Sequence, residues 1–146
     1  MKIQLIWVGK TKERFILEGI NKYIRLLKPY AEVSITEIKE EKGRDIQRMR
    51  AKEDERIERL QIPYVLLDER GKNLSSVEFA KFLEDRRPAI SFVVGGAYGV
   101  SDHVKEMARE RIALSQMTLT HEMARLVLTE QLYRAFTILH KRGYHH

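Results

Sequence analysis

Four polar side chains in the last predicted helix are spaced for chemistry. His121 and Arg125 lie four residues apart, as do Glu130 and Arg134, so each pair shares one helix face. Nine residues separate the two arginines, which directs them to opposite sides of a helix that turns about 100° per residue. Each arginine is half of a structural ion pair, a surface charge, or a clamp on an anionic ligand, because a planar guanidinium binds phosphate and carbonyl oxygens.

The chain ends on Gly143-Tyr144-His145-His146, which has two interpretations. Adjacent histidines at a terminus suggest a cloning remnant, and the terminal position favours disorder. Alternatively, Tyr144 is an aromatic side chain that can stack on a base, and a histidine beside it titrates near neutral pH.

A glycine-rich loop is the other candidate site. The apolar run Phe92-Val93-Val94 predicts a buried strand, Gly95-Gly96-x-x-Gly99 ends it, and Ser101 can cap a following helix. A strand, a glycine loop and a helix start form a common ligand-binding corner of an α/β sheet, and equally a tight turn without a ligand. The spacing matches neither the dinucleotide fingerprint nor the phosphate loop, which disfavours a nucleotide-binding module.

Metal and nucleophile chemistry lack their usual residues. The chain has no cysteine, which excludes disulfides and thiol catalysis and suits a cytoplasmic protein. His103, His121 and His140 show no metal-ligand spacing, and no Gly-x-Ser-x-Gly elbow is present. We therefore expect no metal site and no serine triad.

Composition limits the class of protein. The 146 residues, 43% of them apolar, are enough for one domain over residues 1–146. No apolar run approaches the roughly 20 residues that span a bilayer, so no membrane partner is expected. The net charge of +6 favours a polyanionic partner such as RNA, although a lysine-rich surface would give the same number.

The hydrophobic patterns alternate between strands and helices. This alternation predicts one α/β domain with a mainly parallel sheet. We expect polar loops at 68–73 and 115–120, a short apolar piece at 112–114, strands at 3–8, 33–36, 64–67 and 90–94, and helices at 11–28, 44–60, 102–111 and 121–141. Ser75 or Ser76 can cap a further short helix, and Thr120 can cap the last one. The last helix is apolar around most of its circumference, which predicts burial between layers or against a second subunit. We therefore expect a homodimer with this helix near the interface.

Five motifs, in order along essentially the whole chain, carry a resemblance to a known family. The sequence resembles the bacterial large-subunit (23S) rRNA pseudouridine N3-methyltransferases, which belong to the SPOUT class of S-adenosylmethionine enzymes. The motifs are Leu66-Leu67-Asp68, the run Phe92 to Gly99, the run Leu114 to His121, Glu130-Gln131-Leu132-Tyr133-Arg134-Ala135 and Tyr144-His145. Two positions depart from the pattern: Thr120 and Gly143 stand where relatives often carry proline.

The resemblance implies a fold, an assembly and a cofactor. The fold would be a five-stranded parallel α/β sheet with helices on both faces, threaded at its C-terminal part into a trefoil knot, in an obligate homodimer. S-adenosylmethionine would lie in the knot loops. The cofactor residues carried over are Leu67, Gly96, Ser115, Gln116, Met117, Thr118, Leu119 and Thr120.

The resemblance also implies methyl transfer to a ring imide nitrogen of a base in an rRNA hairpin loop, within a ribosomal particle. Such a nitrogen must lose its proton, so a base and an anion-stabilising cation are needed. Arg134 is the expected cation, His145 or His121 the proton acceptor, and Tyr144 positions the nucleoside. A small enzyme without an appended RNA-binding domain would take its specificity from the shape of the ribosome.

Two other functions remain open. A SPOUT methyltransferase acting on tRNA would have a similar cofactor site, and the Tyr-His tail distinguishes it. A basic RNA-binding assembly factor that no longer binds the cofactor would keep the same charge.

Overall fold

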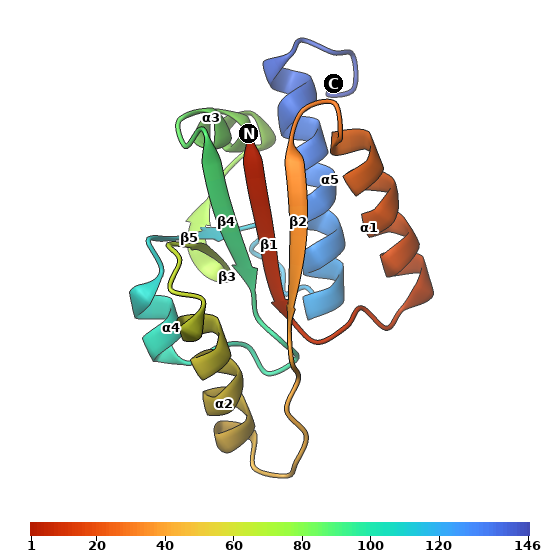
Figure 1. Ribbon diagram of the computed structural model, residues 1–146. Helices are drawn as coiled ribbons and strands as arrows, with labels where there is room; N and C mark the ends of the chain where they lie inside the picture. Colours follow the sequence, from red (N-terminus) through yellow and green to blue (C-terminus); the bar gives the residue numbers. More distant parts are fainter.

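Strands and helices alternate along the whole chain in the computed structural model, which describes residues 1–146 (Figure 1). The elements are β1 (Lys2–Val8), α1 (Arg14–Leu27), β2 (Glu32–Ile38), α2 (Ile46–Arg59), β3 (Val65–Asn73), α3 (Ser76–Glu84), β4 (Ala89–Val94), α4 (Asp102–Met107), β5 (Glu110–Ala113) and α5 (His121–Leu139). One five-stranded sheet has the order β2-β1-β4-β3-β5, and all neighbours are parallel. The predicted α/β fold with a parallel sheet is confirmed.

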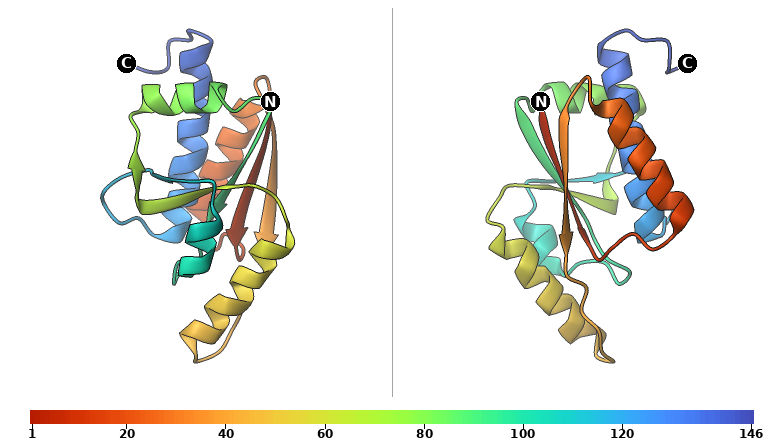
Figure 2. Two further views of the ribbon diagram at one scale, coloured as in Figure 1. Left: turned by 90° about the vertical axis from the view of Figure 1, so that its left-hand side faces the viewer. Right: turned by 45° about the vertical axis from the view of Figure 1, so that its right-hand side comes forward.

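Side chains of β1 divide the interior into two cores. Ile3, Leu5 and Trp7 contact the larger core beneath α1, α3 and α5, whereas Ile6 and Val8 contact a smaller core beneath α2 and α4. This division follows from the two-residue period of a strand. Figure 2 shows α5 and α1 on one side of the sheet and α2 and α4 on the other. Helices therefore cover both faces, as expected.

The helix ends follow local signals in the sequence. Helix α1 ends before Pro29, and Ser75 caps α3 in a capping box with Glu78. Thr120 caps α5 by accepting a hydrogen bond from the Met123 amide, 3.1 Å away. These three boundaries were readable because the interactions that set them lie within four residues.

Two predicted segments are wrong. The helix predicted at 102–111 ends at Met107, and Glu110–Ala113 forms the edge strand β5. The cause is non-local: Ala108 is extended, and the Arg109 amide donates to the Tyr64 carbonyl, which aligns the chain with β3. The predicted loop at 68–73 instead continues β3 past an irregularity, where Lys72 pairs with Ile112.

Helix α5 packs against both α1 and α3. Its fully buried apolar side chains include Leu128, Leu132 and Phe136, which join the larger core. Packing against α1 on one side and α3 on the other accounts for apolar side chains on several sides of α5. No helix combines the length and apolar character needed to cross a bilayer.

Candidate functional site

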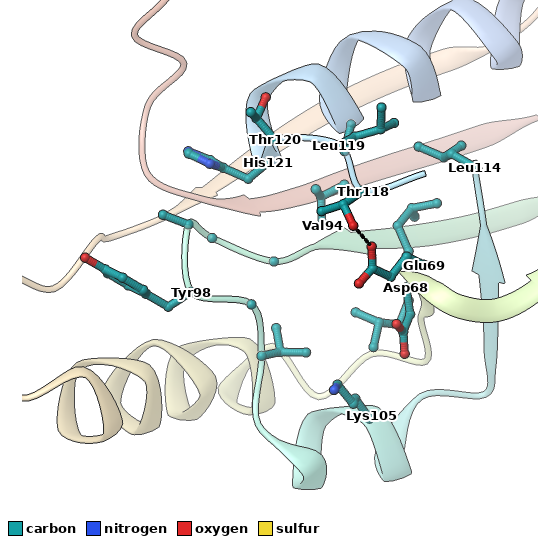
Figure 3. A pocket seen from close by; sticks show the side chains of 18 of the residues that line it. Asp68, Glu69, Val94, Tyr98, Lys105, Leu114, Thr118, Leu119, Thr120 and His121 are labelled. Atoms are coloured by element: carbon teal, nitrogen blue, oxygen red, sulfur yellow. Dashed lines mark hydrogen bonds between the residues drawn. The ribbon is translucent and has the colours of Figure 1, made fainter. Parts of the chain in front are cut away.

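A pocket of about 630 Å³ lies at the carboxyl edge of the sheet (Figure 3). Three segments line it: the stretch Leu66 to Glu69 of β3, the glycine loop from Gly95 to Val100, and the chain around the start of α5 from Leu114 to His121. The carboxyl ends of parallel strands are where α/β sheets bind ligands. Its volume falls within the range of about 300 to 1,000 Å³ that is usual for small-molecule sites.

The glycine loop is a tight turn that side chains would disrupt. The Gly99 amide donates to the Gly96 carbonyl at 3.0 Å, and Gly99 adopts a φ of +73°, which L-residues rarely tolerate. A Cβ on Gly95 would lie 3.2 Å from Val100 Cγ1, and one on Gly96 would lie 3.3 Å from Val8 Cβ. The loop backbone therefore packs closely on β1 and presents its peptide groups to the pocket.

The third segment is tied to the other side of the pocket by hydrogen bonds. Thr118 Oγ1 donates to Glu69 Oε2 at 2.5 Å, the contact drawn in Figure 3, and the Met117 amide donates to Ser115 Oγ at 2.9 Å. The Met117 side chain itself is 78% exposed. The segment is thus held in place while one flexible apolar side chain remains free at the rim.

His121 stands at the pocket and at the first turn of α5. Burial lowers the pKa of His121 below its ordinary value, and the nearby Arg125 guanidinium lowers it further. A neutral imidazole is favoured at pH 7, so one ring nitrogen of His121 can accept a proton.

Residues Tyr144 and His145 of the tail pack against α5 around Arg134. Arg134 Nη2 pairs with Glu130 Oε1 at 2.7 Å, and Arg134 Nη1 lies 3.1 Å from Nδ1 of His145. The guanidinium carbon is 4.8 Å from the centre of the Tyr144 ring, whose hydroxyl donates to Glu130 Oε1 at 3.2 Å. The disorder favoured by the terminal position is therefore not seen: the tail belongs to a charged and aromatic cluster with α5.

In this tail cluster the pKa values of Arg134 and Tyr144 are both raised, so both side chains stay protonated at neutral pH. The hydrogen bond to Glu130 raises the pKa of Arg134. Burial, followed by a hydrogen bond with Tyr23, raises the pKa of Tyr144 to about 12. At neutral pH Tyr144 is therefore a hydrogen-bond donor, not a base.

His121 of the pocket begins α5, whereas the tail follows the other end of this helix (Figure 1). Thirteen residues from His121 to Arg134 correspond to about 20 Å along a helix axis. Within one chain, Arg134, Tyr144 and His145 therefore cannot touch a ligand beside His121. The predicted catalytic residues divide into one at the pocket and three at the far end.

Comparison with known sequences identifies the family. A sequence model described as "Predicted SPOUT methyltransferase" matches residues 1–145. The chain belongs to the SPOUT methyltransferase family. The family resemblance stated from the sequence is confirmed, and so is the expectation of a methyltransferase.

Individual relatives of this SPOUT methyltransferase are similar over their full length. A protein of Geobacter sulfurreducens named "Ribosomal RNA large subunit methyltransferase H" is 46% identical over 154 aligned positions, covering 100% of both chains. A protein of Thermodesulfovibrio yellowstonii with the same name is 45% identical, covering 99% of each chain. Among solved structures, a probable methylase family protein from Haemophilus influenzae matches with a TM-score of 0.57 at 15% identity, covering 99% of this chain and 70% of that one. This last likeness supports the fold alone.

Most residues predicted to bind a cofactor line the pocket of this SPOUT methyltransferase. The exception is Gln116, which is exposed and does not line it. The seven that do are Leu67, Gly96, Ser115, Met117, Thr118, Leu119 and Thr120.

Two cations at the pocket had no signal in the sequence. Arg50 comes from α2 and Lys105 from α4, and both line the pocket. The sequence around each residue gives no sign of a ligand site, so only the packing of the helices shows that these cations face the pocket. Tyr98, inside the glycine loop, also lines the pocket and was overlooked despite its adjacent motif.

Arg125 has a structural role. Its guanidinium is fully buried and donates to the Val8 carbonyl at 2.5 Å, the Gly9 carbonyl at 3.2 Å and Thr11 Oγ1 at 3.0 Å. These bonds hold the connection between β1 and α1 against α5. Of the two interpretations of the arginines, Arg125 fits the structural one, with backbone carbonyls in place of a carboxylate.

Proposed function

We propose that this chain transfers a methyl group from S-adenosylmethionine to N3 of a pseudouridine in a hairpin loop of large-subunit (23S) rRNA, within the assembled ribosome. The observation that carries the proposal is the single pocket formed by three separate loops at the carboxyl edge of the sheet. The names of the two relatives support large-subunit rRNA as the substrate. An RNA substrate also agrees with the net charge of +6 and implies a cytoplasmic site of action.

The pocket residues fit S-adenosylmethionine. Apolar side chains of Leu67, Leu114, Leu119 and Ala124 line it and can enclose a flat base, while the peptide groups of Gly96 can read polar edges. When bound, the cofactor supplies an activated methyl group on a sulfonium. The chain itself must bind the two reactants, exclude water and move one proton.

We assign the remaining chemistry to the two ends of α5. His121 or His145 would accept the N3 proton, and the Arg134 guanidinium would stabilise the negative charge that develops on the imide. Tyr144, held protonated, would position the nucleoside by stacking and by donating its hydroxyl hydrogen. The chain's own part would be to take the proton from N3 onto an imidazole nitrogen.

The proposal includes a homodimer in which the tail of one protomer completes the pocket of the other. The separation of about 20 Å between His121 and Arg134 supports this arrangement, because no single chain could unite them. Tyr133 and Leu139 of α5 remain only partly buried in one chain, which leaves apolar surface for a partner. We include the trefoil knot of the single domain 1–146, supported by family membership and by the return of α5 from edge strand β5 to lie between α1 and α3.

The test of the activity is methyl transfer in vitro to ribosomes, naked 23S rRNA and tRNA, followed by mass mapping of the modified nucleoside. Label on a large-subunit pseudouridine, with ribosomes preferred, is the expected result. Methyl label on tRNA instead would show that tRNA is the substrate. Calorimetry showing no S-adenosylmethionine binding, with or without RNA, would favour a non-catalytic assembly factor.

A mixing experiment tests the shared site. One variant lacks Tyr144 to His146, and the other carries Ser115→Trp to fill the pocket. Each variant alone is expected to be inactive, and mixed dimers should regain activity, since one intact pocket meets one intact tail. If each pocket used its own tail, mixing would restore nothing. Sedimentation of the native chain as a monomer at micromolar concentration would contradict the dimer.

A further inference from the structure

The charged segment around α2 is nearly neutral in sequence but not on its surface. Residues 39–59 contain eight basic and seven acidic residues. Folding separates them. Glu53 and Asp54 are buried on the inner side of α2: Glu53 accepts a hydrogen bond from the Glu41 amide at 2.9 Å, and Asp54 accepts one from the Ser101 amide at 3.0 Å.

Other acidic groups of the segment are also engaged within the chain. Glu41 pairs with Arg56, Glu40 pairs with Lys12 at 3.3 Å, and Asp45 caps α2 by accepting from the Arg48 amide. These contacts engage part of the negative charge of the segment within the chain, while Asp45, Glu55 and Glu58 stay exposed.

The cations of the N-terminal half are left facing solvent. We call Lys42, Arg44, Arg48 and Lys52 the α2 basic face; all four are exposed, and none makes an ion pair or a side-chain hydrogen bond within the chain. Helix stability does not explain this arrangement. Arg48 and Lys52 are like charges one turn apart, and Arg44 and Arg48 flank a helix N-terminus that favours negative charge. No acidic residue lies in the first turn of α2.

Helix α2 carries the basic face on its outer side and reaches the pocket with its inner side. Figure 1 shows α2 extending beyond the end of the sheet at which the pocket loops lie. Arg50, on a different side of α2, lines the pocket itself. Tyr98 of the glycine loop is 57% exposed, and in Figure 3 its ring points away from Asp68, Glu69 and Lys105. The rim of the pocket therefore carries an exposed aromatic ring.

We propose that the α2 basic face and Tyr98 form the docking surface for the RNA strand that carries the target base. This inference rests on the proposed function, whose RNA-binding surface it locates. Arg48 and Lys52 rise about 6 Å apart along the helix, so the face forms a line, which suits a polyanionic backbone better than a single small anion. Tyr98 offers a stacking platform for a base beside the target.

The test compares two variants with the same loss of charge. Arg44→Gln/Arg48→Gln removes two cations of the α2 basic face. The control, Lys72→Gln/Lys81→Gln, removes two exposed, unpaired cations, one in β3 and one in α3. Figure 1 shows α3 and α2 at opposite ends of the molecule. Ribosome binding by co-sedimentation at several salt concentrations, the kcat/KM of methyl transfer, and the Kd for S-adenosylmethionine are measured for each.

We expect the α2 variant to bind ribosomes about tenfold more weakly, with a shallower dependence of log K on log salt by roughly one to two units. Its kcat at saturating ribosomes and its Kd for S-adenosylmethionine should match those of the native chain and the control. Tyr98→Ala should raise the KM for ribosomes, and Tyr98→Phe should not, because the ring is kept.

Equal ribosome binding by the native chain and the α2 variant would overturn the inference, and so would equal weakening in the control. Binding to phosphatidylserine vesicles that depends on Arg44 and Arg48, with ribosome binding that does not, would overturn it in favour of a membrane surface. If the native chain transfers no methyl group to any RNA, the proposed function fails, while the binding measurements still decide the docking surface.

Discussion

Arg125 and Arg134 lie on one helix and have opposite environments. Arg125 is fully buried near the start of α5, and burial lowers its pKa. Arg134 is partly exposed near the end, and its hydrogen bond to Glu130 raises its pKa. Arg125 donates to fixed backbone carbonyls of the β1–α1 connection, whereas Arg134 contacts side chains of α5 and of the tail.

The difference shows how burial separates a structural charge from a functional one. A buried guanidinium whose hydrogen bonds are used within the fold has little left for a ligand: only Nε of Arg125 is without a partner, and it is enclosed. The partly exposed guanidinium of Arg134 bonds only to side chains, which can exchange partners more readily than backbone groups of the fold. We therefore expect Arg125 to determine stability and Arg134 to determine activity.

The largest effect should come from Arg134→Ala. Removing a cation that stabilises charge in the transition state is expected to lower kcat about 10²- to 10³-fold. The free energy of unfolding should change by less than about 1 kcal/mol, because the Glu130 pair is partly solvated. Arg134→Lys keeps the charge but loses the planar fork, so intermediate activity is expected. An unchanged kcat in Arg134→Ala would show that Arg134 has no role in catalysis.

The complementary change is Arg125→Met. It leaves the Val8 and Gly9 carbonyls without their charged donor, which should lower the free energy of unfolding by about 3 kcal/mol. Urea denaturation measures the loss. Arg25→Met, which removes an exposed cation of α1, is the control and should change stability by less than about 0.5 kcal/mol. Similar values for the two variants would show that Arg125 is not a structural clamp.

Sequence patterns located the parts of this fold that local interactions determine. Ser75 and Thr120 were readable as helix caps because their bonding partners lie three residues away. The pattern failed between Asp102 and Arg111, where six residues are helical, two form a bend and the last two join a strand. The Arg109 amide bonds to the Tyr64 carbonyl, and no local propensity encodes a contact across 45 residues.

The site was predictable to the same extent. Gly96 and the segment Ser115 to Thr120 stood out as motifs, and they do line one pocket, apart from Gln116. Arg50 and Lys105 could not be recognised, because packing of α2 and α4 places them there. Glu53 read as one more charge on a solvated helix, yet it is buried, and burial raises its pKa.

A smaller effect is expected at the cap that starts α5. Thr120→Ala removes the acceptor of the Met123 amide and should lower the free energy of unfolding by about 1 kcal/mol. Thr118→Ala is the matched control: it removes an exposed hydrogen bond to Glu69 and no helix cap, so its change should be near zero. Thermal denaturation distinguishes them, and an equal loss in both variants would assign the effect to the loop.

The smallest expected effect is the pH dependence carried by His121. Because its pKa is lowered by burial and by Arg125, the folded chain binds this proton more weakly than the unfolded chain does. Neutral His121 therefore contributes stability above pH 6.5, the ordinary pKa of a histidine. This contribution is lost as the pH falls from 6.5 through the lowered pKa of the folded chain. Native protein should lose more stability than His121→Gln between pH 7.5 and 5, as measured by urea midpoints. Arg125→Met should reduce the same difference, since one cause of the lowered pKa is gone; an unchanged difference would show that the charge of Arg125 does not lower the pKa of His121.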